Sequence, residues 1–156
     1  MTGVRSLAGY LALSPADRLD VMRAFVWLTL VDVGLRTVGF HHLVRQARIR
    51  GVRRVSADGR PGHGRAQRCA HWIEVAARHH VVSAPCLKRS LALHHWLCWE
   101  GLPSALRIGV RKEGGELKAH AWVEYDGRVI NDRPEAAAAF TQLAVREAAI
   151  ALSACE

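Results

Sequence analysis

The spacing of apolar residues predicts a long helix near the start of the chain. Ser14 precedes Pro15, and Asp17 follows in the first turn, an arrangement typical of a helix start. Beyond it, apolar residues recur three or four positions apart, as in a helix with one face against a core. They are Leu19, Met22, Val26, Leu30 and Val33. We therefore expect a helix from Pro15 to about Arg36 with this stripe buried.

Two further helices are expected after a loop. SADGRPGHG, residues 56–64, collects turn-forming residues and divides the chain. Residues 65–80 suit a helix with a face of small side chains, and VVSAP interrupts it. Pro85 fits the first position of the next helix, which Gly101 and Pro103 should end. One face of that helix would carry Leu87, Leu91, His94 and Cys98.

The pattern becomes strand-like after Pro103. SALRIGVRK alternates in part, EGGE forms a turn, and LKAHAWVEY and RVIND flank Asp126-Gly127. Three antiparallel strands are expected, followed by an alanine-rich helical tail. The fold class is α+β within one domain, residues 1–156: an N-terminal helical arm over 1–55, a helix packed on a small antiparallel sheet over 64–133, and the tail over 134–156.

Composition places the chain among folded proteins. Half of its residues are hydrophobic and 23% are charged. The four cysteines form no C-x-x-C pair, which favours free thiols. The N-terminus lacks the order of a signal peptide, and the apolar run AFVWLTLVDVGL is too short to cross a bilayer. These features predict a cytoplasmic protein without a stable membrane anchor.

Positive charge is concentrated in the first part of the chain. The net charge is +8, and residues 1–63 hold 10 Arg against 4 Asp. The densest stretch is LVRQARIRGVRR, residues 43–54, which suits a solvated surface or the binding of phosphates or of an acidic partner. No aromatic residues interleave with these arginines, so we expect no nucleic-acid partner.

Cys86 lies where a thiol can be activated. A helix start offers backbone N–H groups without helical partners and a partial positive charge, which favour a thiolate. The N–H of Cys86 could also donate to an oxyanion. A lone cysteine in an apolar segment, taken by itself, is more typical of a small buried hydrophobe.

His120 and Asp132, on neighbouring strands, are candidate partners for this thiol. A thiol nucleophile needs an imidazole to accept its proton, and the imidazole needs an acceptor that orients it. Each residue alone suits a structural role as well, but the order Cys, His, Asp on helix, strand and strand is more specific. A two-residue Asp126-Gly127 loop would put His120 and Asp132 on opposite faces, whereas a three-residue loop starting at Tyr125 would pair them. A triad therefore predicts the three-residue loop.

Metal binding is a weaker alternative. His94 and Cys98 lie four residues apart, and the pairs His41-His42 and His79-His80 add ligands by type. Neighbouring residues on a helix point about 100° apart, however, so such pairs rarely bind one ion. We expect neither a metal nor a cofactor.

Three stretches carry a resemblance to a known family. CLKRSLAL, GLPSALRIGVR and AHAWVEYDGRVIND resemble the transglutaminase-like superfamily of papain-type thiol enzymes, and more narrowly the leader peptidases of lasso-peptide biosynthesis. The resemblance covers about residues 64–133. It implies that Cys86 is the nucleophile of a cysteine protease, His120 the general base and later acid, and Asp132 the group that orients His120.

The resemblance also implies partners. The substrate would be a ribosomally made precursor peptide whose leader is removed before a separate ATP-dependent cyclase, a further possible partner, closes the ring. Some relatives carry a fused leader-recognition domain. This chain has no segment for one, so the stand-alone type with a separate recognition protein is expected, and the basic arm could dock it. Two alternatives stay open: a transglutaminase-like acyl transfer to an amine by the same triad, and a non-catalytic basic binding module.

Overall fold

The computed structural model describes residues 10–53, 62–80 and 83–143, with side chains in α3 described through residue 47. Before the sheet, these residues include the helices α2 (Pro15–Thr37), α3 (Phe40–Arg53), α4 (His63–His79) and α5 (Cys86–Trp99). The strands β1 (Ser104–Glu113), β2 (Glu116–Tyr125) and β3 (Arg128–Val129) follow. The short helix α6 (Pro134–Ala138) and the strand β4 (Thr141–Leu143) come last. The predicted α+β class is confirmed.

The sheet has four antiparallel strands in the order β3-β2-β1-β4. The sequence predicted only three, because the segment that forms β4 was assigned to a helical tail. The tail does begin as a helix at Pro134, but α6 ends at Ala138, and β4 then pairs with the free edge of β1. Residues 144–156, the remainder of the predicted helix, lie outside the described residues.

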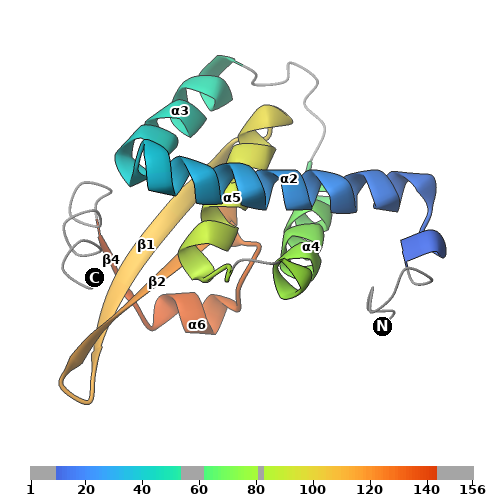
Figure 1. Cartoon of the computed structure of the whole chain (residues 1–156). Helices are drawn as coiled ribbons and strands as arrows, with labels where there is room; N and C mark the ends of the chain where they lie inside the picture. Colours follow the sequence, from blue (N-terminus) through green and yellow to red (C-terminus); the bar gives the residue numbers. More distant parts are fainter. Residues whose placement is uncertain (1–9, 54–61, 81–82, 144–156) are drawn as a thin grey trace.

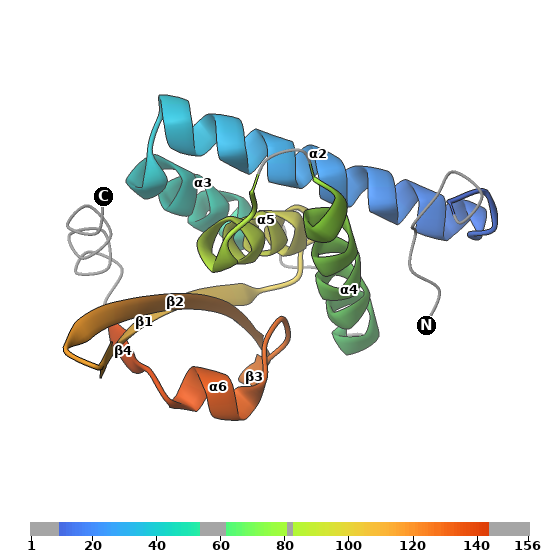
Figure 2. The same cartoon turned by 60° about the horizontal axis from the view of Figure 1, so that its bottom comes forward.

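The helices α2 to α5 form a layer on one side of the sheet (Figures 1 and 2), and α6 lies on the other side (Figure 2). In the second view α2 lies farthest from the sheet, with α4 and α5 between them. Helix α5 contacts both β1 and β2 as well as the other three helices of the layer, and it is buried on every side from Ser90 to Cys98. The sequence predicted one buried face for this helix, whereas the neighbouring helices and strands cover every face of it.

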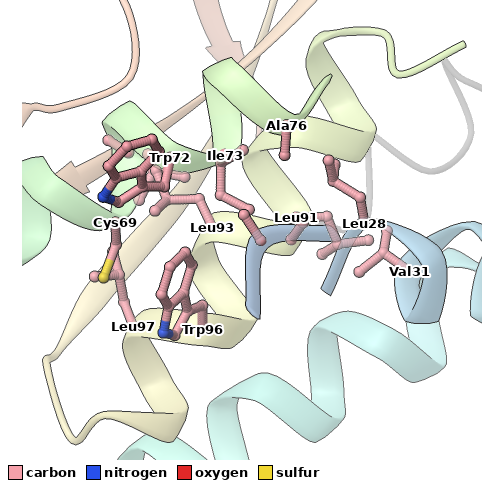
Figure 3. Close-up of a cluster of buried hydrophobic side chains, with 14 of the residues drawn as sticks. Leu28, Val31, Cys69, Trp72, Ile73, Ala76, Leu91, Leu93, Trp96 and Leu97 are labelled. Atoms are coloured by element: carbon pink, nitrogen blue, oxygen red, sulfur yellow. The ribbon is translucent and has the colours of Figure 1, made fainter. Parts of the chain in front are cut away.

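The main core lies where α2, α4 and α5 meet (Figure 3). Each large side chain buried there contributes on the order of 2 kcal/mol relative to an exposed position. Helix α5 is therefore held firmly along its length, which fixes the position of its first residue, Cys86. The labelled side chains are Leu28 and Val31 from α2, Cys69, Trp72, Ile73 and Ala76 from α4, and Leu91, Leu93, Trp96 and Leu97 from α5.

Helix α2 has the predicted start but buries a different face. The hydroxyl of Ser14 accepts a hydrogen bond from the N–H of Asp17, as expected of an N-cap. The stripe predicted to be buried faces solvent instead: Leu19, Met22, Val26, Leu30 and Val33 are about half exposed. The buried face holds Val21, Ala24, Leu28 and Val31 together with two aspartates, Asp20 and Asp32.

The ion pairs of the two buried aspartates explain why this face of α2 packs against the other helices. Asp20 accepts hydrogen bonds from Arg65 at 2.6 and 3.0 Å and from Arg68 at 2.7 Å, both on α4. Asp32 accepts one from Lys88 on α5 and another from Arg36 at 3.0 Å. Arg65 also donates to Glu100, just after α5. These ion pairs join three helices, and an apolar pattern along α2 cannot reveal them.

Among the helices that the structure describes, none combines the length and the hydropathy that a bilayer crossing requires.

Replacing Asp20 should lower stability in a pH-dependent way. Burial raises the pKa of Asp20, but the hydrogen bonds from Arg65 and Arg68 outweigh it, so its pKa lies below the usual value. Its contribution is therefore present above the pKa of an unfolded aspartate and is lost as the pH falls through the folded-state value. Asp20→Asn should reduce the free energy of unfolding by about 2–4 kcal/mol at pH 7.

Urea unfolding of the wild type and of Asp20→Asn at pH 7 and at pH 3 measures this difference. The gap between the two proteins should narrow markedly at pH 3. An equal gap at both pH values would contradict the assigned role of the ionised carboxylate.

Candidate active site

Cys86 is the first residue of α5. Pro85 is the N-cap, with φ −62° and ψ 170°, so the helix starts one residue later than predicted. At this position the N–H of Cys86 is still one of those without a helical acceptor. The side chain is half-buried beside Ile108 and Ala121 of the sheet. The proline and the sheet together fix the direction of the thiol.

A cleft of about 200 Å³ lies between α4, α5 and the sheet. The structure brings all three sequence-predicted residues, Cys86, His120 and Asp132, into its wall. They come from three separate segments: the start of α5, the middle of β2 and the chain just after β3. The remaining lining residues are Ala70, Ile73, Glu74, Arg89, Ser90, Ala121 and Asn131.

The imidazole of His120 is held on three sides. Its Nε2 atom lies in hydrogen-bond contact with Oδ2 of Asp132, so Nδ1 is the ring nitrogen that does not take part in this contact. The ring stacks with Trp122 at a centroid distance of 6.1 Å and lies 5.1 Å from Phe140. The other carboxylate oxygen of Asp132 accepts the N–H of Arg133 at 2.7 Å. Orientation of the ring is thus set by one acceptor and two aromatic neighbours.

The hairpin that carries His120 and Asp132 has a two-residue loop, so the predicted three-residue loop is wrong. Tyr125 pairs with Arg128, and Asp126 and Gly127 have φ of 50° and 70°. These positive φ values fit a tight turn that matches the twist of a hairpin. Continued in this register, the strand would turn Asp132 away from His120. It does not continue, because β3 ends at Val129.

The side chain of Asn131 replaces a backbone hydrogen bond at the point where the pairing of β2 with β3 ends. Ile130 still donates its N–H to the carbonyl of Val123 at 3.0 Å. The N–H of Val123, however, donates to Oδ1 of the Asn131 side chain at 2.7 Å. The backbone can therefore leave the sheet without losing that hydrogen bond, and the next residue, Asp132, is free to turn toward His120.

The same asparagine side chain also contacts α5, the helix that starts at Cys86. Its Nδ2 donates to Oγ of Ser90 at 2.9 Å, and that hydroxyl donates to the carbonyl of Ala121 at 2.9 Å. Ser90 lies one turn after Cys86, Ala121 follows His120, and Asn131 precedes Asp132. We name this group the Ser90–Asn131 clamp. It joins the three segments that carry the predicted site residues.

Gly109 leaves room for the aromatic neighbours of His120. It lies opposite His120 in the register of β1 and β2. A Cβ atom there would lie 2.7 Å from Cβ of Phe140 and 3.0 Å from the ring of Trp122. Sequence reasoning missed Gly109, although a glycine inside a strand often marks a close approach. Phe140 and the clamp residues gave no comparable signal.

A charged pair borders the cleft. Arg89 of α5 donates to Glu74 of α4 at 2.8 Å, and both side chains are partly exposed. The helices α4 and α5 thus each contribute one charged side chain to the wall of the cleft, and this ion pair links the two helices. Small residues, among them Ala70 and Ala121, line the space next to them.

The other candidate residues lie elsewhere. His94 approaches Oγ of Ser104 at 2.8 Å and Sγ of Cys98 at 3.8 Å, and burial lowers its pKa to about 4. Burial raises the pKa of the Cys69 thiol to about 12 and that of Cys98 above its usual value. Among the described cysteines, Cys86 alone is not buried. Within the described ranges, no three His, Cys, Asp or Glu residues are grouped so as to hold a metal ion.

The basic stretch over residues 43–54 is only partly visible. Residues 43–53 lie in α3, but the side chains of Arg48, Arg50 and Arg53, and the whole of Arg54, lie outside the described residues. The docking of an acidic partner by this basic stretch stays a prediction.

A cysteine at a helix start shares the cleft with a histidine on an antiparallel sheet and with the aspartate that contacts this histidine. This combination is typical of thiol enzymes with a histidine base. A family model described as the transglutaminase-like superfamily matches residues 25–145. The chain therefore belongs to the transglutaminase-like superfamily. The match begins inside α2 and ends just beyond β4, so it includes α3 as well as the cleft. No curated protein and no solved structure gave a match.

Gly109→Ala should disturb the site through Phe140 and Trp122. The added Cβ forces the segment at Phe140 to shift, at a cost of about 1–3 kcal/mol in stability, and it loosens the His120 ring. The rate of Cys86 alkylation by iodoacetamide at pH 7 should fall with it. Gly64→Ala is the matched control, because nothing lies within 4 Å of its Cβ position. An unchanged alkylation rate in Gly109→Ala would contradict the packing argument.

Asn131→Ala should separate positioning from stability. It removes both hydrogen bonds of the Asn131 amide, to the N–H of Val123 and to Oγ of Ser90, so Asp132 and His120 lose their fixed placement relative to α5. We expect Cys86 alkylation at pH 7 to slow by about tenfold, since small misplacements of reacting groups have large effects on rate. Ser90→Ala should give a smaller effect of the same kind.

Alkylation is measured in a Cys155→Ser background, since Cys155 lies outside the described residues, and urea unfolding is measured alongside. A structural role alone would lower stability in Asn131→Ala without changing the alkylation rate of the folded protein or its pH profile.

Proposed function

We propose that this protein is a cysteine peptidase that removes the leader from a ribosomally made lasso-peptide precursor, with Cys86, His120 and Asp132 as its catalytic triad. The observation that carries the proposal is the contact between His120 and Asp132 in the wall of the cleft that Cys86 also lines. Membership of the transglutaminase-like superfamily supports a thiol-enzyme chemistry.

The reaction would proceed in two steps. The sulfur of Cys86 attacks the carbonyl carbon at the junction of leader and core, and Nδ1 of His120 takes the thiol proton. His120 then donates that proton to the amine of the core as the peptide bond breaks, which leaves the leader as a thioester on Cys86. Water, deprotonated by His120, hydrolyses the thioester and frees the leader carboxylate.

Two features of the fold would assist these steps. The N–H groups of the first turn of α5 lie next to the sulfur and could donate to the oxyanion that forms during attack. Asp132 would stabilise the imidazolium and keep Nδ1 turned toward the thiol. Both contributions come from parts of the structure fixed before substrate binds, namely the start of α5 and the clamp beside Asp132.

The narrower assignment to leader removal is supported by the sequence motifs. CLKRSLAL starts at the nucleophile, and AHAWVEYDGRVIND ends at Asp132, so the resembling stretches contain the whole proposed triad. The substrate would be the leader region of the precursor, presented by a separate recognition protein. The freed N-terminus of the core would be the substrate of a separate cyclase.

Cys86→Ala should abolish cleavage of the precursor while leaving the fold intact, because it removes the nucleophile. Asp132→Asn should slow cleavage by roughly 10²–10⁴-fold, since the amide cannot stabilise the imidazolium or hold the same tautomer. Cys98→Ala serves as a control that removes a buried thiol outside the cleft. Cleavage of the precursor, with the recognition protein present, is followed by mass spectrometry.

The masses of the products also separate the alternatives. A free leader carboxylate and a free core support a peptidase, whereas a leader joined to an added amine would indicate acyl transfer. Robust cleavage by Cys86→Ala would contradict the proposed mechanism altogether.

A further inference from the structure

Helix α2 exposes a continuous row of large apolar side chains. The row, which we call the α2 apolar row, consists of Leu19 (49% exposed), Met22 (56%), Val26 (54%), Leu30 (54%) and Val33 (51%). At 1.5 Å per residue it runs for about 21 Å along one side of the helix. Single exposed apolar residues are common on protein surfaces, but a contiguous row of this length points to a binding surface.

The row is narrow, which indicates what kind of surface would fit it. It has the three- and four-residue spacing of a helix seam, and exposed Thr29 and Arg36 border it on one side. Helices that lie in a membrane interface usually present a wider apolar face with aromatic anchors, and the row contains no aromatic residue. A single row suits a partner helix that packs along α2.

Charge at the edges of the row selects among possible partners. The acidic residues of α2 all turn away from it: Asp20 and Asp32 are buried, and Asp17 pairs with Arg68. Arg18, Arg23 and Arg36 lie on α2 at the edges. Arg23 pairs with Asp20 and Glu100, and Arg36 pairs with Asp32, but these carboxylates are largely buried, whereas 65% of the Arg36 side chain is exposed. The next helix, α3, contains no acidic residue. A second copy of this chain would bring the same basic edges together, whereas a partner with carboxylates beside its apolar face would complement them.

We propose that the α2 apolar row docks a protein partner that presents an apolar helix face bordered by acidic residues. The identification of this partner as the leader-recognition protein rests on the proposed function.

The position of α2 fits such a role. The cleft lies between α4, α5 and the sheet, and α2 covers the other side of that helical layer (Figure 2). A partner on the row would leave Cys86 accessible while keeping a bound leader close to the protein. Tethering of this kind raises the local concentration of the substrate, so it should act on KM rather than on kcat.

The test introduces charge into the row. The double variant Val26→Asp/Leu30→Asp replaces two exposed side chains at the centre of the row, and Leu117→Asp is the matched control, with 53% exposure at the start of β2. Binding of the purified recognition protein is measured by calorimetry, and precursor cleavage by kinetics. We expect at least a tenfold loss of affinity and a raised KM in the double variant, with kcat unchanged and no effect in the control. Circular dichroism and the alkylation rate of Cys86 verify that the fold and the site persist.

Each outcome decides one of the two proposals. Equal affinity of the double variant and the wild type for the recognition protein, or no binding by the wild type, overturns the docking site. Self-association of the wild type, or its binding to phosphatidylglycerol vesicles, that is lost in the double variant also overturns it, because the row then has another occupant. Recognition-protein binding through the row without any cleavage by the wild type supports the docking site and rejects the peptidase.

Discussion

The arrangement of the cleft depends on one amide side chain. The side chain of Asn131 accepts a hydrogen bond from the N–H of Val123, which has no backbone acceptor after β3 ends. It also donates a hydrogen bond to Ser90 on α5, the helix that starts at Cys86. An unpaired N–H inside a protein costs about 1–3 kcal/mol, so a strand cannot leave a sheet freely. The amide removes that cost at the one place where Asp132 must turn. The same group that ends the ladder therefore joins the helix to the sheet.

The helical layer provides the rigid support for this junction. Helix α5 is buried along most of its length, and ion pairs connect α2 both to α4 and to α5. Buried charge pairs contribute modest net stability, but removal of one partner is costly, which makes them sensitive to helix displacement. Hydrophobic packing keeps α5 in place, and the charges fix which face of α2 meets it. Cys86, the first residue of α5, is held in position by both interactions.

The sequence predicted the boundaries of the helices and strands and the residues of the candidate site better than it predicted the contacts between distant segments. The starts of α2 and α5, the end of α5 at Gly101 and the β1–β2 hairpin follow from local signals of proline, glycine and alternation, and they were predicted within a residue or two. Cys86, His120 and Asp132 were selected by residue type and order, and the structure places them in one cleft.

What could not be predicted depends on contacts between distant segments. Helix α2 is apolar on two sides, so only the partners of Asp20 and Asp32 on α4 and α5 decide which side is buried. The hairpin loop was predicted too long because the argument assumed an unbroken strand, and a side chain that replaces a strand hydrogen bond has no sequence signature. Strand β4 forms because β1 has a free edge, which is a property of the sheet rather than of residues 141–143.

The late position of Phe140 has a consequence during synthesis. The aromatic ring that completes the surroundings of His120 comes after α6, immediately before β4, and the edge strand follows it. A ribosome releases the chain from its N-terminus onward, so the helical layer emerges well before the last support of the imidazole. A nascent chain would thus have Cys86 in place at the start of α5 before Phe140 packs beside the His120 ring.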